Sequence, residues 1–390
     1  MKLSALLLCG LALLGMPAVL PAQTLSPDAQ VSLLTCAPGD ELYSAFGHSA
    51  IRIYDPGTRL DRVYNYGTFD FSPPQFYFDF VGGKLNYRLD AETYQHFDRV
   101  YRYLMRSYTA QVLNLSHAQK EALYQFLEFN YLPENRYYLY DFFFDNCATR
   151  IRDVFTEVLG DSLQWVDFDQ PGPKSMRHML DDHLGDRPWA DFGIDIILAS
   201  PADRIPTHSE ETFLPDNLAI EVGRASIVRN GQIEPLVIQT VPAYVSERLP
   251  SRFPWYLHPL TAGCLLLLVV GGFTAWRWQR HPARYVGDGI LFMVAGLAGW
   301  VILLLWFATD HTTTVRNWNV LWLLPTHLLL GPLLFFRQRP DWLRLYFRIG
   351  AALISLLLLG WWWLPQGLNP WFVPVMLTLL LRSAVLGYRL

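Results

Sequence analysis

Hydrophobic residues crowd into the C-terminal third of the chain, where five apolar stretches alternate with short polar loops. Each stretch approaches the length that an α-helix needs to cross the hydrocarbon core of a membrane. The pattern therefore predicts an all-α membrane domain over residues 255–390, with about five transmembrane helices. The predicted spans are 255–276, 289–307, 320–336, 350–364 and 371–386.

The arginines predict how these spans are oriented. Nine of the ten arginines after residue 254 lie at one set of span ends, and Arg316 alone lies on the other side. Because basic loops stay in the cytoplasm, residues 308–318 and 365–370 are expected outside, together with everything before the first span. Tryptophans near the span ends, among them Trp255 and Trp276, fit the aromatic belts of a membrane interface.

The N-terminus has the features of a secretory signal peptide. Lys2 supplies positive charge, residues 6–14 form an apolar core, and Ala22 before Gln23 fits a cleavage site. We expect residues 1–22 to be removed and residues 23–254 to form an exported catalytic domain. A lipobox ending at Cys9 is an alternative, although the apolar region before it would be very short.

Charge separates the two parts further. Residues 255–390 contain ten Arg, no Lys and three acidic residues, a formal charge of +7. Since the whole chain carries −4, residues 1–254 carry −11. An acidic domain without basic runs among its aromatic residues does not suit nucleic acid, so we expect no nucleic-acid partner. The apolar stretches likewise exclude a wholly soluble protein.

The exported part shows strand patterns near its start. Polar and apolar residues alternate weakly over 30–34 and more clearly over 48–54. The turn signal at Asp55-Pro56-Gly57 leads into strand-forming residues at 62–66, which together predict a β-hairpin.

Helix signals follow these strands. Ser116 and Gln119 form a capping box that opens a helix through about residue 130. A second helix is expected to begin at Asp145 or Asn146 and to run to Val158. The exported domain is therefore of the α+β class.

Cys147 is the candidate nucleophile because it falls in the first turn of that second helix. The helix dipole and the free backbone N–H groups there favour a thiolate, and the N–H of Ala148 could hold an oxyanion. His48, which begins a predicted strand between small neighbours, is the candidate base. The two residues lie about a hundred positions apart, and the fold must bring them together.

Asn65 is the candidate third residue, with the role of orienting the imidazole. It shares a face with His48 if the hairpin pairs position 50 with position 65. A register shifted by one residue would present Tyr64 or Tyr66 instead.

Other interpretations of these residues remain open. Cys36 and Cys147 could form a disulfide in an oxidising compartment, and His48 could be a structural residue of its strand. His178 and His183, with the aspartates between them, are read as a solvated surface rather than a metal site. No zinc-binding spacing is present, so no metal is expected.

Three segments together resemble the Lnb-type lipoprotein N-acyltransferases, a family once known only as a domain of unknown function. They are residues 34–52, residues 64–69 and residues 145–149. The similarity covers most of residues 30–250, and the membrane part, with 317–322 before Pro325, resembles members that carry a C-terminal membrane domain. The order of His strand and Cys helix also resembles permuted papain-like folds of the NlpC/P60 type.

The resemblance implies a reaction. Cys147 would take an acyl chain, the sn-2 chain of a diacylglyceryl lipoprotein, as a thioester and pass it to the α-amine of the lipoprotein's N-terminal cysteine. His48 would move the protons, and no cofactor is required. The implied partners are a diacylated lipoprotein or lipopeptide and membrane lipids. The implied location is the bacterial inner membrane, with the catalytic domain on the periplasmic face.

Two other functions fit the same sequence. A membrane-tethered cysteine peptidase or amidase of NlpC/P60 type could use Cys147 and His48 on cell-wall peptides. A non-enzymatic envelope scaffold could instead hold a Cys36–Cys147 disulfide. The external loop with Asp310, His311 and Arg316 is read either as a binding site for a substrate head group or as an ordinary solvated loop.

Overall fold

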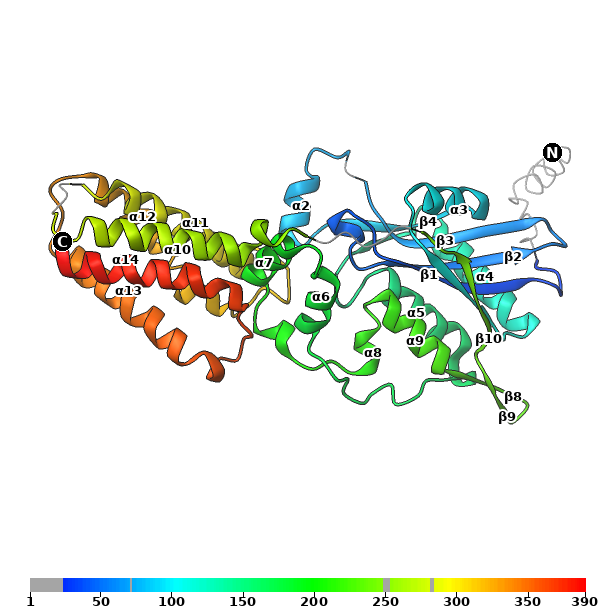
Figure 1. Cartoon of the computed structure of the whole chain (residues 1–390). Coiled ribbons are helices and arrows are strands. Elements are labelled where there is room, and N and C mark those ends of the chain that lie inside the picture. Colours follow the sequence, from blue (N-terminus) through cyan, green and yellow to red (C-terminus); the bar gives the residue numbers. More distant parts are fainter. Residues whose placement is uncertain (1–23, 71, 248–252, 281–283) are drawn as a thin grey trace, which may run out of the picture.

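The computed structural model describes residues 24–70, 72–247, 253–280 and 284–390. The expected signal peptide, with Cys9 inside it, lies outside the described residues. A part that contains a β-sheet and a bundle of long helices lie end to end, so the molecule is elongated (Figure 1). This arrangement confirms the expected class, an α+β part followed by a helical part with five candidate membrane helices.

The larger sheet has seven antiparallel strands in the order β10-β5-β1-β2-β3-β4-β6 within the described part of the chain. The central hairpin has the expected register, because Ile51 pairs with Tyr64 and position 50 is thereby set against position 65. The strands are β1 (Gln30–Cys36), β2 (His48–Asp55), β3 (Leu60–Thr68), β4 (Asn86–Thr93), β5 (Tyr108–Leu113), β6 (Tyr137–Leu139) and β10 (Val237–Tyr244).

Alternation along the strands gives the sheet two apolar faces. Ile51 and Ile53 belong to the core that packs under α4 (His117–Tyr131) and α5 (Cys147–Leu159). Ala50 belongs to the opposite face, which is covered by α3 (Tyr94–Tyr103). Both expected helices are confirmed within a residue or two, including the capping box at the start of α4.

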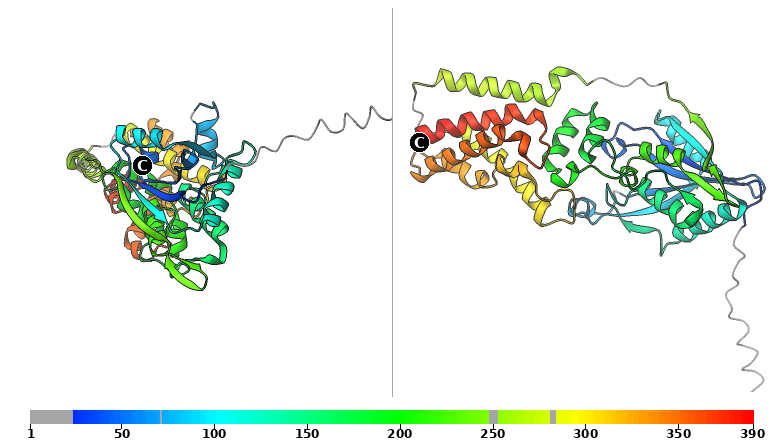
Figure 2. Two further views of the ribbon diagram at one scale, coloured as in Figure 1. Left: turned by 90° about the vertical axis from the view of Figure 1, so that its right-hand side faces the viewer. Right: turned by 90° about the horizontal axis from the view of Figure 1, so that it is seen from below.

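Short helices lie between the sheet and the bundle and beside α5 on one face of the sheet (Figures 1 and 2). They are α2 (Phe76–Gly82), α6 (Met176–Leu184), α7 (Pro188–Ile197), α8 (His208–Glu211) and α9 (Pro215–Arg224). A second, three-stranded sheet forms at the end far from the bundle (Figure 1). Its strands are β7 (Leu163–Gln164), β8 (Ser226–Arg229) and β9 (Gln232–Pro235).

Five segments of the described residues are long and apolar enough to cross a membrane. The third is a broken helix, because Pro325 and Pro332 lack the N–H groups that a continuous helix needs. The segments are α10 (Pro259–Trp276), α11 (Val286–Phe307), Trp318–Phe335 with α12 (Thr326–Leu330), α13 (Trp342–Leu359) and Pro370–Arg389 with α14 (Val373–Arg389).

The fourth span was placed too late by the sequence. The hydropathy pattern predicts 350–364, whereas the helix runs from Trp342 to Leu359 and ends at Gly360. The apolar tryptophans 361–363 form a separate 3₁₀ turn after it. Arg344 and Arg348 therefore lie inside the first turns of α13, not in a loop, and the apolar count alone missed those turns.

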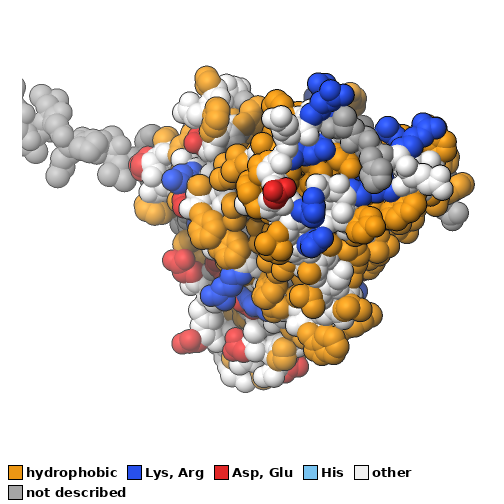
Figure 3. Space-filling model, turned by 90° about the vertical axis from the view of Figure 1, so that its left-hand side faces the viewer, with side chains coloured by type: hydrophobic (Ala, Val, Ile, Leu, Met, Phe, Trp, Pro, Cys, Tyr) orange, Lys and Arg blue, Asp and Glu red, His pale blue; other side chains and the backbone are white. Residues whose placement is uncertain are grey.

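The end of the bundle that faces away from the sheet is rich in arginine (Figure 3). The positive-inside rule predicts that this end faces the cytoplasm and that the sheet lies on the outer side. Arg382 is an exception to the expected position, because it is buried inside the bundle. Its Nε lies 2.6 Å from Oδ1 of Asp288, so the charge is paired rather than exposed in a loop.

Four amide side chains of the bundle hold the last turn of α7 and so join the two parts. The side chains of Asn317 and Asn319 donate to the carbonyl oxygens of residues 195–197, at 2.8–3.2 Å. Gln366 donates to the carbonyl of Leu198 at 3.1 Å, and Asn369 donates to Asp195 at 2.8 Å. These bonds satisfy carbonyl groups that the helix end leaves without partners. They also explain the asparagines of the segment 317–322.

Candidate functional site

Cys147 is the first residue of α5, as expected from the sequence. Asn146 is the N-cap, and its Oδ1 accepts from the backbone N–H groups of Ala148 and Thr149 at 2.8 and 3.0 Å. The Nδ2 of Asn146 donates to the carbonyls of Phe142 and Phe213, so the cap itself is held from two sides. The position of the thiol is therefore fixed by its neighbour in the chain.

The Cys147 side chain lies at the open end of the β2–β3 hairpin, near Ser49 and Gly67. The backbone N–H groups of Ser49, the residue after His48, of Ala148 and of Cys147 itself lie near its sulfur and lower the pKa of the thiol. On the other side lies Gly67, at φ +85°. A Cβ added to Gly67 would stand 3.4 Å from the Cβ of Cys147, so the two backbones pass close to each other. The sulfur of Cys147 thus lies near the backbone of the residue that follows His48, although the two segments are far apart in sequence.

A chain of hydrogen bonds orients His48. Its Nε2 lies 3.0 Å from Oδ1 of Asn65, and Nδ2 of Asn65 donates to Oε1 of Glu92 at 3.0 Å. Since Oδ1 can only accept, Nε2 carries the proton of the neutral ring and Nδ1 carries the lone pair. Beyond Glu92, its Oε2 lies 3.6 Å from Nε2 of His96. The structure therefore joins His48 to Asn65, not to Tyr64 or Tyr66.

Burial decides the protonation of the pair. It lowers the pKa of His48 to about 4, against the opposing effect of the Asn65 hydrogen bond. It also raises the pKa of the Cys147 thiol, and the N–H groups near the sulfur oppose this without reversing it. The thiolate expected from the helix start is thus outweighed by desolvation. At neutral pH the resting pair is a thiol and a neutral imidazole, so proton transfer must accompany attack.

Cys36 does not bridge to Cys147, because both are free thiols. Cys36 packs with Leu34 and Ala50 on the α3 face of the sheet, whereas Cys147 packs against the core under α5. The disulfide alternative is therefore wrong for this structure. Burial raises the pKa of Cys36 to about 12, which leaves it a poor nucleophile.

A pocket of about 350 Å³ opens beside the orienting residues. It is lined by polar side chains of β3, β4 and α3, with the imidazole of His48 at one wall. The lining residues are His48, Asn65, Thr68, Asp90, Ala91, Glu92 and His96. Small polar molecules can therefore reach the imidazole from the α3 side.

Arg106 and Tyr138 are site residues that the sequence did not indicate. The Arg106 charge lowers the pKa of both Cys147 and His48, and its Nη2 is buried without a described hydrogen-bond partner. The Tyr138 hydroxyl is also buried without such a partner, near Gly67 and Cys147. Burial raises the pKa of Tyr138 well above its usual value, so the hydroxyl remains a donor. Neither residue lies in a motif, which is why sequence alone missed them.

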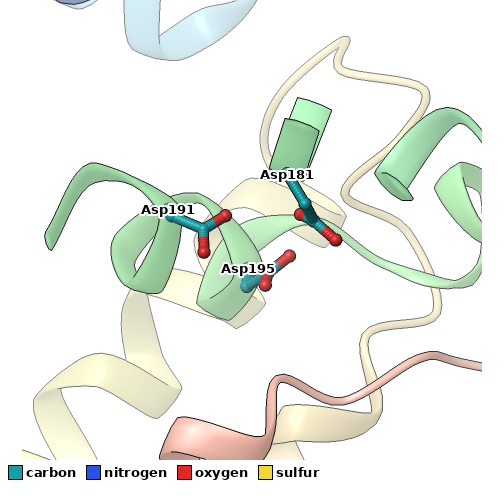
Figure 4. A group of neighbouring side chains, drawn as sticks. All are labelled: Asp181, Asp191 and Asp195. Carbon is teal, nitrogen blue, oxygen red and sulfur yellow. The ribbon is translucent and has the colours of Figure 1, made fainter. Parts of the chain in front are cut away.

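Three carboxylates beside the bundle form the one described group that could hold a metal ion. Asp181, Asp191 and Asp195 point toward one another, with oxygens within 4.8 Å (Figure 4). Arg177 already pairs with Asp195 at 2.5 Å, and burial followed by the neighbouring charges raises the pKa of Asp181 and Asp191. Shared protons and Arg177 therefore neutralise much of the charge. Asp181 faces this interior, so the solvated surface expected around His178 and His183 does not include it.

Comparisons with known proteins give two matches of one family. A family model described as the Lnb N-terminal periplasmic domain matches residues 20–181. A second, described as the Lnb transmembrane domain, matches residues 251–389. The first contains His48, Asn65 and Cys147, and the second contains all five candidate spans. Searches of the curated proteins and of the solved structures gave no match.

Proposed function

The chain belongs to the Lnb family, with its periplasmic and transmembrane domains in order, and from this we propose that it is a lipoprotein N-acyltransferase. It moves the sn-2 acyl chain of a diacylated lipoprotein to the α-amine of the terminal cysteine, through a thioester on Cys147. The observation that supports the proposal is the position of Cys147 at the start of α5, with its sulfur near the backbone N–H of Ser49, the residue after the His48 that Asn65 orients.

The position of the site suits a lipid substrate. The loop after α11 touches the segment before Cys147, where Thr312 Oγ1 lies 3.5 Å from Oδ2 of Asp141. Asp141 is six residues from the thiol, so the nucleophile lies close to the outer surface of the membrane. We place this membrane as the bacterial inner membrane, because the arginine-rich end faces the cytoplasm.

The chemistry follows from the protonation states. The thiol of Cys147 attacks the ester carbonyl carbon, a C–S bond forms, and the C–O bond to glycerol breaks. Nδ1 of His48 takes the thiol proton and returns it to the glyceryl oxygen. The free amine then attacks the thioester, so that a C–N bond replaces the C–S bond and the proton returns to sulfur. Because the N–H of Ala148 donates to Asn146, the backbone N–H of Cys147 itself is the donor proposed for the developing oxyanion.

The fold class of the catalytic part supports this use of the residues. A strand that begins with His48 precedes a helix that begins with Cys147, the order found in permuted papain-like enzymes. Asn65 then serves as the polar group that fixes the ring. A neutral thiol suits a site that must resist oxidation between turnovers.

The test is acylation of a synthetic diacylglyceryl lipopeptide by the full chain in detergent. Because transfer within one molecule conserves mass, tandem mass spectrometry must locate the acyl chain on the amine. Cys147→Ala and His48→Ala should abolish the N-acyl product, whereas Cys264→Ala, on α10, should not. N-acyl product from Cys147→Ala would refute the proposal. Cleavage of cell-wall peptides instead of acylation would support the peptidase.

A further inference from the structure

Helix α2 presents an aromatic surface that the fold of the periplasmic part does not cover. Tyr77, Phe78, Phe80 and Val81 are 70%, 82%, 54% and 44% exposed, so four of its seven residues turn apolar groups outward. Of the seven residues of α2, only Phe76 is buried. Contiguous apolar surface of this kind on an exported domain marks a binding face.

The height of α2 above the membrane is set by the loop after α11. The backbone N–H of Asp310 donates to the carbonyl of Gly82 at 3.0 Å, and Nε2 of His311 lies 3.2 Å from the carbonyl of Phe80. Gly83, at φ +70°, is so close that an added Cβ would stand 3.2 Å from the His311 nitrogen. Because α11 ends at Phe307, α2 lies level with the outer end of a span, and both views agree (Figures 1 and 2).

Other exposed aromatic residues mark the same level. Trp255 and Tyr256, just before α10, are 76% and 62% exposed, and Phe307 at the end of α11 is 74% exposed. Tryptophan and tyrosine at span ends are typical of the membrane–water interface. The exposed rings of α2 thus lie at the same level along the bundle as these residues at the ends of the spans (Figures 1 and 2).

A row of rings connects α2 with the surroundings of the thiol. Neighbouring rings have their centres 6.4, 6.1, 5.0 and 4.0 Å apart, and the last pair is stacked. The last two rings and Cys147 pack against the same core. In order from α2, the rings are Phe80, Phe76, Phe69, Tyr87 and Tyr140.

We propose that α2 inserts Tyr77, Phe78, Phe80 and Val81 among the acyl chains of the outer leaflet. The occupant of this face is therefore lipid, because the five spans place a lipid surface at that level. A further step rests on the proposed acyl transfer: a substrate chain leaves the leaflet along α2 and follows the row of rings toward Cys147.

Insertion can be tested without measuring activity. A spin label is attached at Phe78→Cys in the full chain. The background carries Cys147→Ala and Cys264→Ala, so that the fully buried Cys36 is the one other cysteine beyond residue 23. The labelled protein is reconstituted into phosphatidylcholine–phosphatidylglycerol vesicles. The matched control is Ile233→Cys, which is 67% exposed on the distant β9 hairpin. We expect severalfold more collision with oxygen relative to a water-soluble nickel complex at position 78 than at position 233. Equal ratios, or a label at 78 shielded from both reagents by protein, would overturn the proposal.

A second measurement separates lipid insertion from the chemistry. Phe78→Asp should reduce acylation of a lipopeptide embedded in vesicles severalfold and leave acylation of detergent-dispersed lipopeptide unchanged, with Ile233→Asp as the control. An equal loss in both systems contradicts the role of α2 in substrate entry. Absence of acylation by the unsubstituted chain refutes the proposed function, while the spin-label result still decides insertion.

Discussion

Nδ2 of Asn65 donates a 3.0 Å hydrogen bond to Oε1 of Glu92 and thereby turns its own Oδ1 toward His48. The carboxylate thus determines the tautomer of an imidazole that it does not touch. Glu92 lies on the strand next to Asn65, and burial raises the pKa of its carboxyl group. Glu92 is a positioning residue for the proposed base.

Removal of Glu92 should slow the chemical step. Glu92→Ala frees the Asn65 amide to rotate, and loss of one charge-assisted hydrogen bond of about 1.5 kcal/mol predicts a roughly 10-fold lower kcat with little change in KM. Glu92→Gln keeps an acceptor and should lose less. Steady-state kinetics check both variants, and an unchanged kcat for Glu92→Ala would exclude the positioning role.

Loss of the Arg106 charge should make the thiol less acidic. The guanidinium lowers the pKa of Cys147, so Arg106→Met raises that pKa and reduces the thiolate fraction at any given pH. The pH profile of iodoacetamide alkylation at Cys147 should move to higher pH, and Arg106→Lys should move it less. A shift to lower pH, or none, would show that the charge does not reach the sulfur.

In the proposed reaction we expect Tyr138 to donate to the oxyanion rather than to act on the thiol. Tyr138→Phe removes one buried donor beside Cys147, and the predicted loss in kcat is on the order of 100-fold, as for other single oxyanion donors. The alkylation profile of Cys147 should stay in place. Tyr137→Phe, on an exposed neighbour, is the control. Retained kcat in Tyr138→Phe would remove this residue from the mechanism.

Asp55 should stabilise the hairpin only when ionised. Burial raises the pKa of this carboxyl, but bonds from Ser26, Thr58 and Gly57 outweigh it and lower the pKa from 3.8 to about 2. The stabilisation, about 2 kcal/mol, is therefore complete above about pH 4 and is lost as the pH falls toward 2.

The substitution Asp55→Ala tests this at neutral pH. Amide hydrogens of Ser26 and Gly57 should exchange about 30-fold faster if local opening becomes easier by about 2 kcal/mol. Asp61→Ala, on a half-buried ion pair with Arg52, should have a smaller effect. Protection that survives in Asp55→Ala would contradict the account.

The sequence predicted the elements that depend on local signals. Alternation placed the hairpin, the turn at residue 55 set its register, and Asn146 marked the start of α5. Cys147, His48 and Asn65 could be proposed because two short motifs and one register argument are enough to bring them to one end of a sheet. That Nε2 of His48 lies against Asn65 follows from this register.

The rest of the site depends on packing between distant segments. The charge of Arg106, just beyond the end of α3, lowers the pKa of the thiol, and Glu92 contacts Asn65 through the pairing of β3 with β4. No sequence motif indicates either relationship. The protonation of Cys147 was misjudged for the same reason, because a helix start is visible in sequence whereas burial is not. The amides that hold α7 also join segments more than a hundred residues apart.

The amide side chains that bind the last turn of α7 fix the distance between the Cys147 thiol and the membrane. Four amide side chains hold the sheet domain on the bundle, those of Asn317, Asn319, Gln366 and Asn369. We therefore expect the domain not to tilt away from the membrane to accommodate a large substrate protein. In the proposed reaction, the acylated end of the substrate must instead approach the thiol at the membrane surface. If the proposed acyl transfer holds, a lipoprotein folded right up to its first residues would collide with the sheet, and we expect its substrates to carry a flexible linker between the anchored cysteine and the folded domain.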